Sequence, residues 1–169
     1  MLVGFMGAGK SAVGRRLAGR LKFRFVDLDH RIEERAGKKI AELFREQGEA
    51  AFRALEREEA GAVSKLENVV VAAGGGAFVV PATRELLRKG ALTVWLQCDL
   101  ETTLRRVRAG GSRPLAGNRE IMRALLAERE PSYRQADVTV DTSRRKPREV
   151  VDRIVELIEG QQEKSSVRP

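Results

Sequence analysis

The chain has 169 residues and a net charge of +8 at pH 7, because 32 Lys and Arg outnumber 24 Asp and Glu. Its length fits one domain, and an apolar fraction of 42% is enough to build a core. One Cys and one His exclude a disulfide framework and a Cys/His zinc site. The positive charge predicts an anionic partner: a nucleotide, a small acid, a nucleic acid or a membrane surface.

The N-terminus and the hydropathy pattern indicate a cytoplasmic protein. The first residues lack the basic segment and the small-residue cleavage site of a signal peptide. No apolar run approaches the roughly 18 residues that a membrane span needs. Aromatic residues, on which readers of single-stranded nucleic acid stack bases, make up only 5% of the chain. We therefore expect neither a membrane nor a nucleic-acid partner.

Short apolar segments alternate with amphipathic ones along the chain. Strands are expected at 1–3, 23–26, 69–73, 91–96 and 138–140. Helices are expected after the first strand, where Val13, Leu17 and Leu21 share a face, then at 30–36, 40–47, 49–66, 81–89, 100–108 and 122–130, and from Pro147 onward. The alternation predicts a three-layer α/β/α fold with a central parallel sheet of about five strands.

The sequence predicts one domain over residues 1–160, followed by a loose polar tail at 161–169. The segment 109–120 contains Gly110, Gly111 and several arginines, and it is typical of an inserted loop. In parallel α/β sheets, ligands bind beyond the C-terminal ends of the strands. Functional residues are therefore expected in the loops at that edge.

A phosphate-binding motif follows the first strand. Residues 4–11, GFMGAGKS, match G-x-x-x-x-G-K-[ST] completely, with a strand before the motif and a helix after it. The glycines let successive N–H groups point at phosphate oxygens, and the helix N-terminus adds partial positive charge. Lys10 supplies a full charge to the phosphates, and Ser11 offers a hydroxyl to Mg²⁺. The motif predicts nucleotide binding and leaves the phosphate acceptor open.

Two acids, Asp27 and Asp29, follow the second strand. They are two residues apart, so in extended backbone their side chains point the same way. The strand at 69–73, where a Walker B acid is usual, ends without an acid. The acids of the site are therefore expected after the second strand.

Three further features lie later in the chain: the pair Arg53 and Glu56, the triple glycine 74–76, and Arg129. An Arg–Glu pair three residues apart is usually a surface ion pair worth about 0.2–0.5 kcal/mol. A triple glycine is usually a turn. Only the combination of these features with the phosphate loop indicates a functional site.

Together these motifs resemble the shikimate kinase family. The resemblance rests on GFMGAGKS (4–11), DLD (27–29), GEAAFRALE (48–56), AAGGG (72–76), RPL (113–115), REPSY (129–133) and DTSRRKP (141–147), and it spans residues 1–158. It implies a P-loop kinase fold with a mobile lid at about 109–120. It also implies ATP- and Mg²⁺-dependent phosphorylation of the 3-hydroxyl of shikimate, in the route to chorismate and the aromatic amino acids, by a cytoplasmic monomer.

The resemblance implies an acceptor site, whose residues are Asp29, Arg53, Glu56, Gly74, Gly75, Gly76 and Arg129. Two arginines suit the carboxylate of shikimate, because a guanidinium binds a carboxylate bidentately. Glu56 is placed to orient Arg53. Asp29 is placed to accept a hydrogen bond from the attacking hydroxyl. The glycines let a substrate hydroxyl approach the backbone.

It likewise implies a nucleotide site, whose residues are Gly7, Ala8, Gly9, Lys10, Ser11, Ala12, Arg108, Arg113, Arg145 and Pro147. Lys10, Asp29 and Arg113 form the implied catalytic set, in which Arg113 reaches the transferring phosphate from the lid. Arg108, with Arg106 as the alternative, lies on one side of adenine, and the segment 145–147 lies on the other. Ser11 and Asp27 hold Mg²⁺, Asp27 through bound water.

Two alternatives remain open from the sequence. Another small-molecule P-loop kinase, acting on gluconate or a nucleoside monophosphate, would share the phosphate loop, but GEAAFRALE and REPSY argue against it. A nucleotide-binding regulator without catalysis is disfavoured, because Lys10, Asp29 and Arg113 are all present. Two anionic substrates, ATP and shikimate, account for the positive charge without a nucleic acid.

Overall fold

The computed structural model describes residues 1–109 and 118–166, and the side chains of 108–109 and 161–166 lie outside that description. Arg113 and most of the predicted lid at 109–120 also lie outside it. The strands are β1 (Leu2–Val3), β2 (Arg24–Asp27), β3 (Val69–Ala72), β4 (Val94–Gln97) and β5 (Val138–Asp141). The helices are α1 (Lys10–Leu21), α2 (Leu28–Ala36), α3 (Ile40–Val63), α4 (Pro81–Arg88), α5 (Leu100–Ala109), α6 (Arg119–Tyr133) and α7 (Pro147–Ser166).

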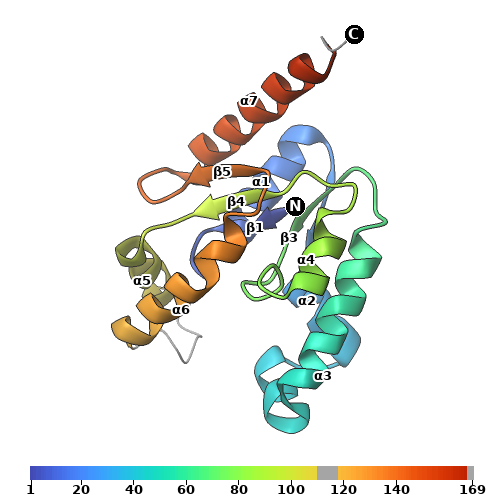
Figure 1. Ribbon diagram of the computed structural model, residues 1–169, viewed down its shortest axis with the longest axis vertical. Coiled ribbons are helices and arrows are strands. Elements are labelled where there is room, and N and C mark those ends of the chain that lie inside the picture. The colour runs from blue at the N-terminus through green and yellow to red at the C-terminus, as the bar shows by residue number, and fades with distance from the viewer. Residues whose placement is uncertain (110–117, 167–169) are drawn as a thin grey trace.

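In this described part of the chain, five strands form one parallel sheet in the order β2-β3-β1-β4-β5 (Figure 1). The short strand β1 lies in the middle, where Leu2 pairs with Ala72 of β3 and with Val94 of β4. All the C-terminal ends meet at one edge, so the loops that follow β1, β2 and β3 lie next to one another. The predicted parallel fold is confirmed.

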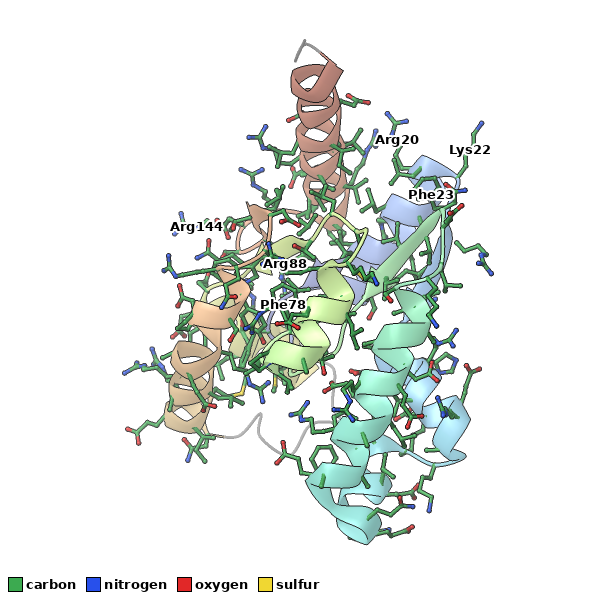
Figure 2. The ribbon with its side chains drawn as sticks, turned by 45° about the vertical axis from the view of Figure 1, so that its right-hand side comes forward. Arg20, Lys22, Phe23, Phe78, Arg88 and Arg144 are labelled. Carbon is green, nitrogen blue, oxygen red and sulfur yellow. The ribbon has the colours of Figure 1, made fainter. Side chains whose placement is uncertain are left out.

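The two faces of the sheet bury two separate apolar cores. Successive strand residues point to opposite faces, so Leu2 belongs to the core that includes residues of α1 and α7, while Val3 belongs to the core that includes residues of α2 to α6. Many basic side chains instead cover the outer surface, among them Arg20, Lys22 and Arg144 (Figure 2). Within the residues described, no helix combines the length and the apolar composition needed to cross a bilayer.

Glycines interrupt the helices at two predicted breaks. Gly37 follows α2 with a φ of 67°, and Gly48 kinks α3 with a φ of 79° and a ψ of 175°. Both backbones lie in the left-handed half of φ space, which glycine enters without the steric penalty of a Cβ. The helices expected at 40–47 and 49–66 are therefore two arms of α3 that meet at Gly48.

The helix predicted over 122–130 is wrong at both ends. It begins earlier and continues past Pro131 to Tyr133, because the N–H of Arg134 donates to the carbonyl of Glu130 at 3.0 Å and closes the turn after the proline. Helix α7 extends to Ser166, into the segment that is predicted to be a polar tail from residue 161. Its residues 161–164 are Gln, Gln, Glu and Lys, whose unbranched side chains favour a helix despite their polarity.

We predict opposite effects of alanine at two glycines with equally open surroundings. A Cβ at Gly19 or at Gly37 meets nothing within 4 Å, but Gly19 is helical whereas Gly37 has a φ of 67°. Gly19→Ala should raise the free energy of unfolding by about 0.5–1 kcal/mol, and Gly37→Ala should lower it by about 1 kcal/mol or more. Urea unfolding measures both, and a shift of the same sign would contradict the backbone argument.

Candidate active site

The phosphate loop connects the central strand β1 to helix α1. Gly7 and Gly9 have φ values of 76° and 92°, and Gly9 is the N-cap of α1. The Nζ of Lys10 donates to the carbonyl oxygens of Gly4 and Phe5 at 2.8 and 2.9 Å. The Lys10 amine therefore lies over the loop at the positive end of the helix dipole, where anions bind.

Two side chains donate hydrogen bonds to backbone carbonyl groups of this loop. Arg106 donates to the carbonyl of Gly7 at 3.3 Å and to that of Thr142 at 2.8 Å. The buried hydroxyl of Thr142 contacts the carbonyl of Ala8 at 3.2 Å. In a trans peptide, C=O and the next N–H point in opposite directions. Holding the Ala8 carbonyl thus also sets the direction of the Gly9 N–H, whereas the Ala8 N–H donates to the carbonyl of Phe5 at 3.3 Å.

The residues predicted to contact adenine come shortly after Thr142 in the chain. Arg145 is exposed in the turn between β5 and α7, and Pro147 is the first residue of α7. Because Thr142 touches the phosphate loop, this turn begins beside that loop. Arg106, the alternative to Arg108, is occupied by the phosphate loop and Thr142, while the side chain of Arg108 lies outside the described part.

Oxygen donors suited to Mg²⁺ lie next to the phosphate loop. The hydroxyl of Ser11 donates to Oδ2 of Asp27 at 2.6 Å. Mg²⁺ prefers oxygen ligands and usually takes one or two from the protein, together with substrate phosphates and water. Ser11 and Asp27 therefore fit a magnesium site.

Asp27 and Asp29 do not share one face of a strand, so that prediction is wrong. Asp27 ends β2 in extended backbone with a φ of −103° and a ψ of 118°, whereas Asp29 lies in the first turn of α2. An acid in the first helical turn is favoured by the helix dipole. The helix turns the Asp29 carboxylate toward the triple glycine, so closely that a Cβ at Gly74 would collide with it.

Charged side chains surround the triple glycine after β3. A Cβ at Gly76 would lie 2.7 Å from Nη1 of Arg53. A Cβ at Gly75 would lie 3.7 Å both from Nη1 of Arg129 and from the backbone nitrogen of Met6 in the phosphate loop. The guanidinium carbon of Arg129 lies 5.9 Å from the centre of the Phe5 ring. The predicted acceptor residues thus meet beside the phosphate loop.

Arg53 is held by two acids of α3 in different surroundings. Its Nη1 donates to Glu56 at 2.6 Å, and Glu56 is almost completely buried. Its Nε and Nη2 donate to the exposed Glu49 at 3.2 and 3.1 Å. Burial raises the pKa of Glu56, and the nearby carboxylate of Asp29 raises it further, while Arg53 and Arg129 oppose the shift. The structure therefore brings Glu56 to Arg53, as expected.

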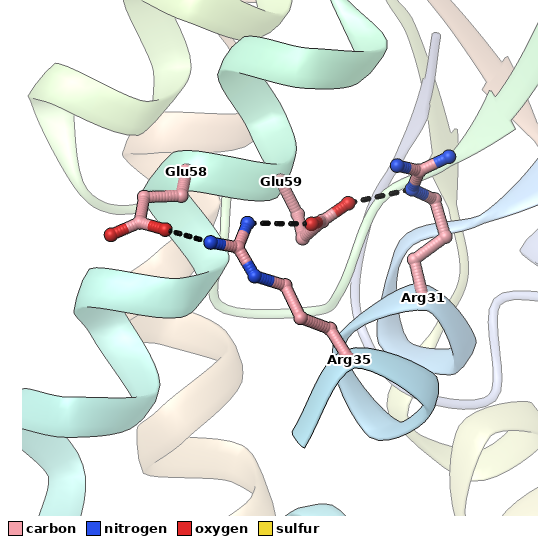
Figure 3. A network of polar contacts seen from close by, with 4 residues as sticks. All are labelled: Arg31, Arg35, Glu58 and Glu59. Carbon is pink, nitrogen blue, oxygen red and sulfur yellow. Dashed lines mark hydrogen bonds and ion pairs between the residues drawn. The ribbon is translucent and has the colours of Figure 1, made fainter. Parts of the chain in front are cut away.

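An ion network around one buried carboxylate joins α2, which carries Asp29, to α3, which carries Arg53 (Figure 3). Glu59 is 4% exposed and accepts from Arg31 at 2.6 Å and from Arg35 at 2.9 Å. Arg35 also pairs with the exposed Glu58. Burial by itself would raise the pKa of Glu59, but the hydrogen bonds from Arg35 and Arg31 outweigh it, and the pKa lies below its usual value.

Sequence reasoning missed three polar contacts at this site. They are made by Arg106, Thr142 and Tyr133, the last of which donates its hydroxyl to the carbonyl of Gly75. Each acts on a backbone carbonyl far away in the chain, so no local pattern marks it. The only available signal was the spacing of Arg129 and Tyr133, which puts both on one face of a helix.

Comparison with known proteins places this geometry in context. The family model described as shikimate kinase matches residues 6–159. A shikimate kinase of Nitrobacter winogradskyi is 48% identical over 93% of this chain and 75% of its own length, and one of Geobacter metallireducens is 45% identical over 95% and 91%. The solved shikimate kinase of Acinetobacter baumannii, in complex with shikimate, has a TM-score of 0.89 at 36% identity, covering 95% of this chain and 92% of that one.

We predict that the ion network stabilises the fold in a pH-dependent way. Glu59→Gln should lower the free energy of unfolding at pH 7 by about 1–3 kcal/mol, because the buried carboxylate loses its charge and the two charge-assisted hydrogen bonds that it accepts from Arg31 and Arg35. The pKa of Glu59 is depressed in the fold, so this stabilisation is present above its unfolded value of 4.5 and is lost as pH falls through the folded pKa.

The matched control is Glu58→Gln, because Glu58 is exposed and pairs with the same Arg35. An exposed ion pair contributes little, so this change should cost under about 1 kcal/mol. Denaturant unfolding between pH 3 and pH 8 separates the two variants. Equal losses, or a Glu59→Gln loss that does not shrink in acid, would contradict the assignment.

Proposed function

Because the chain belongs to the shikimate kinase family and catalyses the ATP-dependent phosphorylation of shikimate, we propose that the residues around the triple glycine bind shikimate and orient its reacting hydroxyl toward the ATP at the phosphate loop. The observation that carries this proposal is the position of Gly75, at which a Cβ would lie 3.7 Å from both the Arg129 guanidinium and the backbone nitrogen of Met6. The acceptor and the nucleotide would thus meet at one point.

Arg53 and Arg129 would bind the shikimate carboxylate. The two bonds from Arg53 to the exposed Glu49 can be exchanged for bonds to a substrate, whereas the bond to the buried Glu56 would stay and keep the guanidinium in place. Asp29, whose carboxylate lies against Gly74, would accept the hydrogen bond of the attacking hydroxyl and hold its oxygen in line with the γ-phosphate.

On the nucleotide side, the N–H groups of 7–12 and the amine of Lys10 would bind the phosphates of ATP. Lys10 would exchange its bonds to the Gly4 and Phe5 carbonyls for bonds to phosphate oxygens. Ser11 and Asp27 would hold Mg²⁺, which when bound neutralises charge on the phosphoryl group. Arg113, Arg108, Arg145 and Pro147 stay predictions for the transferring phosphate and for adenine.

The remaining parts of the proposal concern the setting of the reaction. We propose that the protein acts as a monomer in the cytoplasm, without a nucleic-acid or membrane partner. Its one Cys suits a reducing compartment. Its excess positive charge is accounted for by two anionic substrates and by an arginine-rich, solvated surface.

We predict that Asp29→Asn lowers shikimate-dependent ADP release by at least about 100-fold, because an amide cannot take up the hydroxyl proton. Nucleotide binding, measured by calorimetry, should remain within about two-fold, since Asp29 lies on the acceptor side. Asp152→Asn, which changes an exposed carboxylate on α7, is the matched control and should behave as wild type. Full turnover in Asp29→Asn would remove this residue from the mechanism.

We predict that Arg129→Ala raises the KM for shikimate by about 10- to 100-fold, the loss expected for a charged hydrogen-bonding partner of a carboxylate. The KM for ATP should change by less than about three-fold. Arg134→Ala, at the C-cap of α6, removes an ion pair with Glu130 and should leave both constants unchanged. Parallel increases in both KM values would show that the acceptor site is misplaced. Steady-state kinetics with each substrate varied decides between these outcomes.

A further inference from the structure

The three carbonyl groups of the triple-glycine turn are held in two different ways. The carbonyl of Gly74 accepts from the N–H of Ala77 at 3.1 Å, and that of Gly76 accepts from the N–H of Val79 at 3.0 Å. These two bonds come from the turn itself. The carbonyl of Gly75 accepts from the hydroxyl of Tyr133, which is 58 residues away in the chain.

Burial, a ring contact and a hydrogen bond hold Tyr133 in place. Its side chain is completely buried, and its ring lies 6.1 Å from that of Trp95, measured between centroids. It lies four residues after Arg129 on α6, so both side chains share one helix face. The Arg129 guanidinium lies close enough to the same hydroxyl to lower its pKa, against the effect of burial. One hydroxyl thus connects Arg129 to the peptide between Gly75 and Gly76.

We propose that Tyr133 is a positioning residue for shikimate, which sets the Arg129 guanidinium and the Gly75–Gly76 peptide in a fixed relation to each other. The inference rests on the proposed function, which makes both of these groups acceptor ligands. In a trans peptide, holding the Gly75 carbonyl also fixes the direction of the Gly76 N–H. A glycine turn has much backbone freedom. A hydrogen bond from outside the turn orders it before the substrate binds, so less conformational entropy is lost on binding.

The hydroxyl is suited to this role over the whole working pH range. Burial raises its pKa to about 12, while Arg129 opposes the shift. It therefore remains a hydrogen-bond donor to the Gly75 carbonyl whenever the enzyme is assayed. A phenylalanine would fill the same space among the apolar neighbours and would remove only this donor.

The test is the kinetics of Tyr133→Phe. We expect the KM for shikimate to rise by about five-fold or more, the loss of one hydrogen bond, while the KM for ATP stays within about two-fold. Thr93→Val is the matched control for stability alone. Its completely buried hydroxyl donates to Asp137 at 2.6 Å, before β4 at the opposite edge of the sheet. It should lower stability and leave both KM values unchanged.

Three results would overturn the proposal: a wild-type KM for shikimate in Tyr133→Phe, an equal rise in both KM values, or the same rise in Thr93→Val. If wild-type protein itself shows no shikimate-dependent ADP release, the proposed function fails instead, and the two failures are thereby distinguished.

A second measurement does not depend on the folding of a variant. Tyr133 is the only tyrosine of the chain, so biosynthetic incorporation of 3-fluorotyrosine labels this position alone. We expect the fluorine NMR signal to shift on addition of shikimate without nucleotide, and not on addition of gluconate at the same concentration. A signal that ignores shikimate, or responds equally to both acids, would also overturn the proposal.

Discussion

The site depends on the parallel pairing of β1 with β3. The N–H of Ala73 donates to the carbonyl of Leu2 at 3.0 Å, so the two central strands end side by side. The phosphate loop leaves one strand and the glycine turn leaves the other, and neither can move along the sheet without breaking that register. The separation between the nucleotide and the acceptor is therefore a property of the backbone. Side chains from α2, α3 and α6 then add the charges, each from a helix that packs on the same face of the sheet.

Charge balance distinguishes this site from the arginine-rich surface around it. Two acids, Asp29 and Glu56, stand against two arginines, Arg53 and Arg129, around the triple glycine. Without Glu56 and its bond at 2.6 Å, the half-buried Arg53 would be free to pair with solvent or to change its rotamer. The buried Glu56 thus lowers the positive potential of the site and fixes the position of the Arg53 guanidinium. The bonds from Arg53 to the exposed Glu49 can be displaced by a substrate.

The sequence allowed most of the fold to be predicted, because its signals are local. Apolar runs and glycine breaks mark the strands and helix ends, and the phosphate loop needs only eight consecutive residues. The errors arise where one local rule overrides another. Spacing by two predicted a common face for Asp27 and Asp29, but a helix begins at Leu28. A proline predicted a helix end at 130, but the turn closed by Glu130 continues it. Thr142 and Tyr133 could not be predicted as site residues, because they bond carbonyls 134 and 58 residues away.

The contact between Trp95 and Tyr133 has an optical consequence. The chain has one tryptophan and one tyrosine, and their rings lie 6.1 Å apart in the fold. At that separation the excited tyrosine passes its energy to the indole, so the native protein emits as a tryptophan protein only. When α6 separates from β4, tyrosine emission returns. The ratio of the two emissions therefore reports, without any label, whether the helix that carries Arg129 is seated against the sheet.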